Sequence, residues 1–132
     1  MSDAALAVQR AAIAALDAHP ALTATLTGVF DGVPERQPYP YVSVSNGLVS
    51  DWSTKTEEGR EVRLAITIWD DGAEATRLHT LCGHAEDALA ALPRDLPGWR
   101  VASNIFIRSL IARDPAGPWA GLVEQRVRII QA

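Results

Sequence analysis

The sequence predicts an α+β domain in which two helices pack on one face of a largely antiparallel sheet of four to five strands with a long β-hairpin. Three observations indicate this class. Two alanine-rich segments repeat their apolar residues at helical spacing, two pairs of segments alternate apolar and polar residues, and the links between them are short. Because 132 residues suit one hydrophobic core, we expect residues 1–132 to form a single domain.

The first helix is expected to begin at Ser2 or Asp3, either of which can cap it, and to end before Pro20. Residues 22–40 are dense in glycine and proline, so they indicate an irregular connection that holds one short strand at residues 29–31. The apolar positions of the helix are Leu6, Ile13 and Leu16.

The second helix is expected over roughly residues 73–92. Asp70 and Asp71 supply an N-cap with favourable negative charge, and Pro93 ends the helix. Its apolar stripe consists of Leu78, Leu81, Ala85, Leu89 and Leu92.

Residues 41–52 and 61–69 alternate apolar and polar side chains and predict the long hairpin. The apolar residues have even numbers in both strands, so the residue numbers of two facing residues must add up to an even number. This requirement favours Thr54 opposite Arg60, with a loop over residues 55–59. The expected apolar face carries Val42, Val44, Leu48, Trp52, Val62, Leu64, Ile66 and Ile68.

Asn46-Gly47 is a competing turn signal inside the first of these strands. A turn there would set Val42 opposite Asp51 and mix apolar with polar residues on each face. We therefore favour a continuous strand with a bulge at Asn46-Gly47.

A second hairpin is predicted from residues 98–113 and 119–130, joined by the turn sequence DPAGP. We expect Arg113 opposite Trp119, a register that also pairs Ile105 with Val127, Ser109 with Val123 and Arg108 with Glu124. The helix-covered face would then carry Trp99, Val101, Ile105, Ile107, Ile111, Val123, Val127 and Ile129.

The other face of this hairpin combines arginines with apolar side chains. Such a face exposes more apolar surface than a monomer usually tolerates, which indicates subunit contact unless residues 22–40 cover it. Its residues are Arg100, Arg108, Arg126 and Arg128 beside Phe106, Leu110, Leu122 and Ile130.

The residue types that catalysis requires form no motif. His79 and His84 are five positions apart on a predicted helix and so lie on different faces, which does not suit a shared metal ion. Cys82 lies in an apolar run typical of a buried small side chain. A net charge of −4 argues against a protein whose main work is gripping nucleic acid. We expect no cofactor, no metal, no cleaved leader and no membrane span.

Trp52 stands in the polar stretch SDWSTKTEEGRE between the two strands of the long hairpin. Its even number places it on the apolar face of the strand, beyond the point where the body of the domain is expected to end. It is either a last core residue or an anchor for a neighbouring subunit, and tryptophan is enriched among interface hot spots.

Three segments, VFDGVPERQPYPYVSVSNG, DWSTKTEEGREVRLAITIW and RDPAGPWAGLVEQRVRI, occur in this order in a chain of this size. Together they resemble the tail-completion or tail-terminator proteins of long-tailed bacteriophages, prophages and gene transfer agents. The resemblance covers nearly the whole chain. Its linked features are an Asp-x-x-Pro loop, Pro-Tyr-Val opening a strand, Asp-Trp-Ser-Thr-Lys before a polar tip, and Asp-Pro before the last strand.

The resemblance implies a structural virion assembly protein without catalytic activity. It implies a ring, expected to be a hexamer, that caps the head-proximal end of the tail tube, stops its growth and prepares it for head joining. The implied partners are further copies of the chain, the tail tube protein and a head-tail connector or stopper protein, with DNA only passing through the lumen. The implied location is the tail of a virion or phage-like particle, assembled in the bacterial cytoplasm.

Two sets of residues are candidate contacts under this hypothesis. The residues expected to contact a neighbouring subunit or the tube are Asp51, Trp52, Ser53, Thr54, Lys55, Glu57, Glu58 and Arg60. The arginines expected to line the lumen or an inter-subunit face are Arg100, Arg108, Arg126 and Arg128.

Other functions compete with the tail terminator. A stopper or connector of the neck is similarly small and ring-forming. A monomeric adaptor could present the β-ribbon as an edge for β-augmentation. A small-molecule enzyme could use Asp31, Glu35 or Arg36 in a cleft beside the sheet, although it lacks a nucleophile, a metal set and a cofactor motif.

Overall fold

The computed structural model describes residues 3–113, 115 and 117–132 and confirms the α+β class. Its elements are α1 (Ala4–Asp17), α2 (Pro20–Thr23), β1 (Val29–Asp31), β2 (Tyr41–Asp51), β3 (Gly59–Asp70), α3 (Thr76–Ala90), β4 (Asp95–Leu96), β5 (Trp99–Arg113) and β6 (Trp119–Gln131). The described residues form a sheet of six strands in the order β1-β2-β3-β6-β5-β4, larger than the predicted four to five. The neighbouring pairs are antiparallel except β1 and β2.

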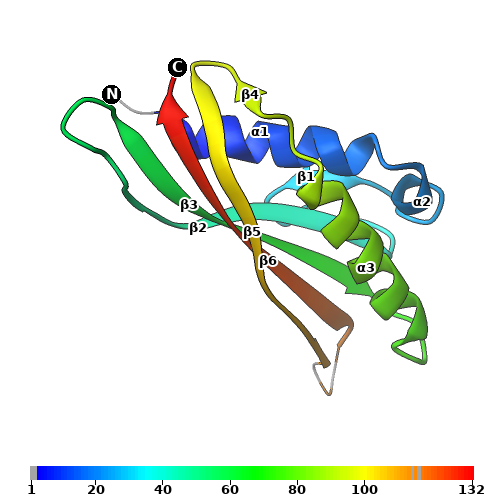
Figure 1. Cartoon of the computed structure of the whole chain (residues 1–132). Coiled ribbons are helices and arrows are strands. Elements are labelled where there is room, and N and C mark those ends of the chain that lie inside the picture. The colour runs from blue at the N-terminus through cyan, green and yellow to red at the C-terminus, as the bar shows by residue number, and fades with distance from the viewer. Residues whose placement is uncertain (1–2, 114, 116) are drawn as a thin grey trace.

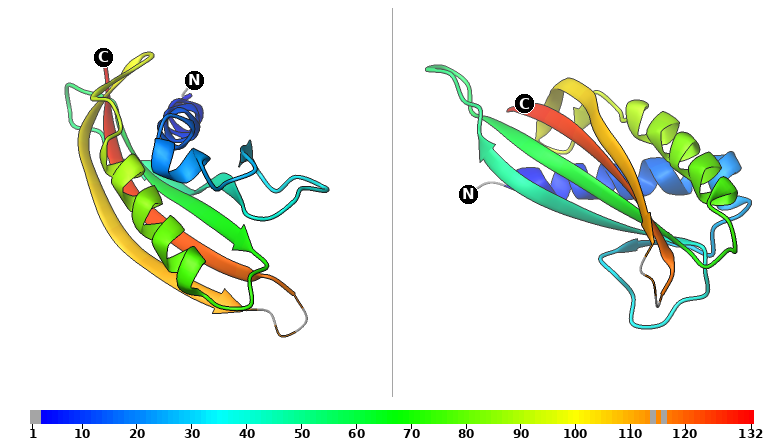
Figure 2. Two further views of the ribbon diagram at one scale, coloured as in Figure 1. Left: turned by 90° about the vertical axis from the view of Figure 1, so that its right-hand side faces the viewer. Right: turned by 90° about the horizontal axis from the view of Figure 1, so that it is seen from below.

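The helices α1 and α3 cover one face of a curved sheet, here called the inner face (Figures 1 and 2). The core lies between them, where apolar side chains at alternate positions of β3 and β6 meet the apolar stripes of both helices. The opposite side of the sheet has no helix on it within the described residues and is called the outer face. The fully buried residues include Val8, Leu16, Val42, Val44, Leu64, Ile66, Ile68, Leu78, Leu89, Val123, Val127 and Ile129.

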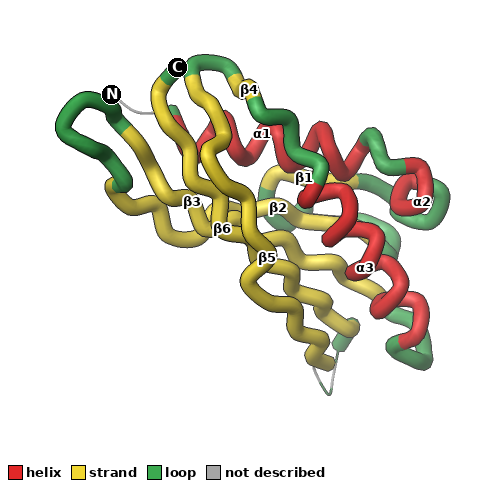
Figure 3. The backbone as a smooth tube through the Cα atoms, viewed as in Figure 1, coloured by secondary structure: helices red, strands yellow, loops and turns green. Residues whose placement is uncertain are grey.

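The long hairpin of β2 and β3 runs through Asn46-Gly47 with a bulge, as predicted. Before the bulge, Val42 faces Ile68, so the even-numbered faces match. After it, Asp51 faces Arg60, and the predicted pairing of Thr54 with Arg60 is wrong. The strands therefore separate earlier than expected, and the tip comprises residues 52–58 instead of 55–59 (Figure 3).

The bulge also changes which side chains face the helices. An extra residue in one strand reverses the odd and even alternation beyond it. Leu48, predicted on the core face, is 71% exposed. Trp52 lies on the outer face, because its neighbour Asp51 is paired with Arg60 of the even-numbered face of β3.

The second hairpin has the predicted register only near its turn. Ser109 faces Val123 and Arg108 faces Glu124, as expected. A bulge between Phe106 and Arg108 then shifts the pairing, so Asn104 faces Val127 in place of Ile105. Ile105 is consequently on the outer face. A second bulge, between Val101 and Ser103, returns Val101 and Arg100 to their predicted faces.

Phe106 lies on the inner face instead of the predicted outer face. It is paired with Gln125, whose odd-numbered neighbours on β6 are core residues. The prediction that placed it among the arginines of the outer face is therefore wrong.

The two predicted N-caps differ from expectation. Asp3 precedes α1 without a side-chain capping bond, and its Oδ1 accepts a hydrogen bond from Trp99 Nε1 at 2.8 Å. Ser2 lies outside the described residues. The helix α3 begins at Thr76, so Asp70 and Asp71 are too far away to cap it. The short elements α2 and β4 were not predicted, since four and two residues are too short for a periodic pattern.

Asp70 instead anchors the segment that leads into α3. Its buried carboxylate accepts a hydrogen bond from Arg77 Nε at 3.0 Å, a second from Arg77 Nη2, and one from the Gly72 backbone N–H at 3.2 Å. The bond from Arg77 holds the pKa of Asp70 below its ordinary value. Such a lowered pKa stabilises the fold at pH values above the ordinary aspartate range, and the contribution is lost as the pH falls through the folded-state pKa.

We predict that Asp70→Asn lowers the free energy of unfolding by about 1–3 kcal/mol at neutral pH, because it removes a charge-assisted pair at a buried site. The difference from the unmodified protein should shrink as the pH falls below the ordinary aspartate pKa of about 4. Urea unfolding at a series of pH values measures both effects. Asp71→Asn is the matched control, since the Asp71 side chain is mostly exposed and should change the stability little.

Candidate subunit interface

The tip of the long hairpin is ordered by its own hydrogen bonds. The Trp52 N–H donates to the Gly59 carbonyl at 2.9 Å, and the Thr54 N–H donates to the Glu57 carbonyl at 2.8 Å. The Thr54 hydroxyl accepts from the Glu57 N–H at 3.1 Å, and the Ser53 hydroxyl accepts from the Gly59 N–H at 3.0 Å. Side chains of serine and threonine thus add to the backbone hydrogen bonds that close the turn.

Ion pairs connect the charged residues at the base of the tip. Arg60 lies 3.3 Å from an Asp51 carboxylate oxygen and 2.7 Å from a Glu58 carboxylate oxygen. These three residues therefore pair with one another, whereas Lys55 and Glu57 are exposed and, among the described residues, form no ion pair. Lys55 and Glu57 are the charges of this predicted set that remain available to a partner.

Gly59 permits the two strands to approach closely where the tip begins. A Cβ atom there would lie 2.4 Å from the carbonyl oxygen of Trp52 and 3.2 Å from that of Ile129. Both neighbours are backbone atoms and cannot move aside cheaply. The glycine is therefore required by space and not by a left-handed backbone conformation.

Trp52 connects the tip to the outer face of the sheet. The Arg128 guanidinium carbon lies 5.2 Å from the centre of the Trp52 ring, and Arg128 Nε donates to Glu61 at 2.9 Å. Stacking of this kind contributes roughly 0.5–1 kcal/mol at an exposed site. Trp52 is only partly buried, so part of its side chain is available to a partner.

Arg126 and Arg128 are even-numbered residues of β6, and Arg100 and Arg108 are paired with even-numbered residues of β6. The four predicted arginines therefore lie together on the outer face. Arg108 donates twice to the Glu124 carboxylate, at 2.8 and 3.1 Å. Arg126 stands directly opposite Arg63 of β3. Sequence reasoning missed Arg63, although its odd number in a strand with even buried positions already places it on this face.

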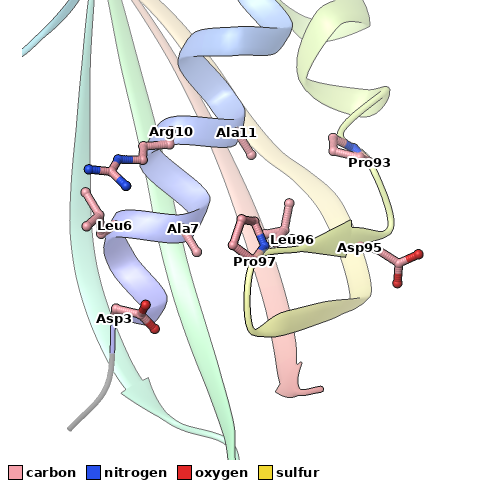
Figure 4. Close-up of a pocket in the computed structure, with 9 residues that line it drawn as sticks. All are labelled: Asp3, Leu6, Ala7, Arg10, Ala11, Pro93, Asp95, Leu96 and Pro97. Carbon is pink, nitrogen blue, oxygen red and sulfur yellow. The ribbon is translucent and has the colours of Figure 1, made fainter.

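A hollow of about 250 Å³ lies on the other side of the molecule, between α1 and residues 93–97. Ala7 and Ala11 of α1 face Leu96 and Pro97 across it (Figure 4). Its lining holds no serine, threonine, cysteine or histidine, so it offers no nucleophile of those types and no imidazole base. The hollow suits an apolar side chain better than a reacting substrate.

The other residues considered for chemistry have structural surroundings. Burial raises the pKa of the Cys82 thiol to about 11, which keeps it protonated and unreactive. Asp31 accepts a hydrogen bond from Gln9 Nε2 at 2.7 Å. Within residues 3–113, 115 and 117–132, no group of three histidine, cysteine or carboxylate side chains is arranged to hold a metal ion. No helix of that part of the chain is long and apolar enough to cross a membrane.

Comparison with known proteins finds a matching family and similar solved structures. A family model described as tail completion protein gp17 matches residues 10–130. A chain in the virion of a native gene transfer agent particle is 27% identical with a TM-score of 0.83, covering 98% of this chain and 99% of that chain. The gp17 protein of bacteriophage SPP1 is 20% identical with a TM-score of 0.64, covering 96% and 91%. No curated protein matches the chain.

We predict that Gly59→Ala lowers the free energy of unfolding by about 1–3 kcal/mol, because the new methyl group would overlap backbone atoms at the base of the tip. Thermal or urea unfolding measures the effect. Gly83→Ala is the control, since a Cβ there meets nothing within 4 Å on an exposed helix position and should stabilise α3 by roughly 0.5–1 kcal/mol. Equal stability of the Gly59→Ala variant and the unmodified protein would contradict the steric account.

Proposed function

This chain belongs to the tail completion protein gp17 family, whose members are structural components of phage tails and not enzymes, and from this premise we propose that it is a tail terminator. The resemblance inferred from the sequence is thereby confirmed. In the proposed function, copies of the chain form a ring, expected to be a hexamer, on the head-proximal end of the tail tube. The ring stops tube growth and prepares the end for joining to the head.

The observation that carries the ring proposal is the uncovered outer face of the sheet. Leu110 and Ile105 are 55% and 45% exposed there, beside the cluster of arginines. The connection over residues 22–40 packs on Tyr41 through Tyr39 and leaves Leu110 and Ile105 exposed. Apolar surface left open on a sheet of this kind is typical of a protein that binds other protein surfaces.

The hairpin tip supports contact with a second partner. It projects from the body at the end of the sheet opposite the turn between β5 and β6 (Figures 1 and 2). An ordered projection loses little conformational freedom on binding. The tube protein or a neighbouring copy is the proposed partner of the tip, and a head-tail connector or stopper is the proposed partner of the finished ring.

The net charge of the chain fits a ring through which DNA passes. A protein with a net charge of −4 does not attract phosphate as a whole, so DNA in a lumen would move without strong adhesion. The same argument applies to a stopper or connector ring, which is the alternative function within the neck.

The monomeric adaptor receives less support from the geometry of β2. Its edge beyond Val44 is not paired with β1, but the bulge between Asn46 and Val49 interrupts it. Bulged edges are poor templates for an added strand.

The proposed function predicts that the protein forms a closed ring, alone or only on tube ends. Light scattering over a range of protein concentrations, with purified tail tubes absent and then present, measures the mass. Tubes should also stop lengthening when the protein is added to growing tube protein. A monomer that ignores tubes at every concentration would contradict the terminator and favour the adaptor. Binding to the connector without any effect on tube growth would favour another neck component.

Trp52→Ala should weaken ring formation or tube capping while the monomer stays folded, because it removes an exposed aromatic face and costs the fold only about 1–2 kcal/mol. Trp52→Phe retains an aromatic face over Arg128 and should keep most of the assembly. Circular dichroism checks the fold, and the light-scattering assay checks assembly. An unfolded Trp52→Ala monomer would instead make Trp52 a residue of the structural core.

A further inference from the structure

The outer face of the sheet is basic although the chain is acidic. It carries five arginines against three carboxylates, a net charge of +2 on a chain of −4. The alternation of paired strands places all eight on the same side. These residues are Arg63, Arg100, Arg108, Arg126, Arg128, Glu61, Asp95 and Glu124.

The helical layer on the opposite side has the opposite charge. Residues 3–23 and 74–92 contain five carboxylates against two arginines, a net charge of −3. Arg77 of this layer is further neutralised by Asp70. The charged residues are Asp3, Asp17, Glu74, Glu86, Asp87, Arg10 and Arg77.

Arg63 and Arg126 at the centre of the basic face form no ion pair among the described residues, whereas Glu61 and Glu124 pair with Arg128 and Arg108. Arg63 and Arg126 stand directly opposite each other on neighbouring strands, an arrangement that is unfavourable for like charges. The Nε atom of Arg126 is shielded from solvent and has no hydrogen-bond partner among the described residues. A shielded donor without an acceptor weakens the fold unless a partner supplies one.

We propose that the outer face of one copy docks on the helical layer of the next copy, with carboxylates of the helical layer entering the region around Arg63 and Arg126. The contact is head to tail, so its repetition closes into a ring when the rotation between copies allows. The inference rests on the proposed function and names the surfaces that build the ring.

Apolar features of the two surfaces complement each other as well. The outer face offers the exposed Ile105 and Leu110 side chains. The helical side offers the hollow between α1 and residues 93–97, next to the half-exposed Leu6. A contact that buries apolar side chains inside a charged surround has the composition of a protein interface.

Two other occupants fit the outer face less well. A face-to-face dimer would bring two basic surfaces together, which like-charge repulsion opposes. DNA phosphates would meet Glu61 and Glu124 among the arginines and gain nothing from the exposed apolar side chains.

Two variants with reversed charge test the contact. Arg63→Glu with Arg126→Glu changes the outer face from +2 to −2, and Asp17→Arg with Asp87→Arg changes the helical layer from −3 to +1. Asp17 and Asp87 are exposed, so their replacement should not disturb the core. Each variant alone would oppose surfaces of like charge. A mixture of the two can alternate around a ring, with every contact again between opposite charges.

Each double variant alone should lose on the order of tenfold or more in self-association or tube capping, and an equimolar mixture should recover it. Circular dichroism verifies that both monomers fold. If the variant with two glutamates does not fold, Arg63→Gln with Arg126→Gln replaces it as the milder change. The inference would be overturned if each variant assembled as well as the unmodified protein, or if the mixture recovered no assembly. Either result would leave the terminator function intact. An unmodified protein that neither assembles nor caps tubes would overturn the function as well.

DNA binding is the remaining outcome. If the outer-face variant assembles normally but loses salt-sensitive retention of double-stranded DNA, the face lines the lumen and the subunit contact is wrong. Unchanged DNA retention together with lost assembly is the result that the inference predicts.

Discussion

The bulge between Asn46 and Val49 fixes what the outer face of this protein presents. A β-strand alternates its side chains strictly, so one extra residue moves every later side chain to the other face. Without the bulge, Trp52 would face the helices at the end of the core. With it, Trp52 stacks on Arg128 at the margin of the arginine cluster. The tip, the tryptophan and the basic surface thus form one continuous region because of a single local irregularity.

The strict alternation of side chains along a strand also explains which parts of the structure the sequence predicts and which it does not. The apolar alternation of β3 and the helical stripe of α3 follow from residue periodicity, and both agree with the structure. The turn signal and the apolar alternation together predict the bulge at Asn46-Gly47. The same alternation places Leu48 and Trp52 on the core face, because it takes no account of the reversal that an extra residue causes. The bulge of β5 between Phe106 and Arg108 carries no glycine or proline to mark it, so residue periodicity does not predict the position of Ile105 on the outer face.

The candidate contact residues show a similar division. The clustering of Arg108, Arg126 and Arg128 follows from strand alternation near the turn, whereas Arg100 joins them because the second bulge of β5 restores the alternation that the first reverses. The pairing of Arg60 with Asp51 and Glu58 depends on where the strands separate, and the predicted loop was misplaced. The position of Asp70 alone predicts a capping role, whereas its partner Arg77 lies seven residues later and is brought near only by the fold. Side-chain pairing across such turns is set by geometry that periodicity does not encode.

Charge connects these local features to assembly. Opposite faces of the molecule carry opposite net charge, so attraction between copies would be directional and would weaken as salt screens it. Electron microscopy of tail tubes mixed with the protein tests this account most directly, at a resolution that separates sheets from helices. The account predicts a ring at one end of the tube, with the outer face of each copy against α1 and α3 of the next. A ring in which the outer faces are open to the lumen, or meet each other, would contradict it.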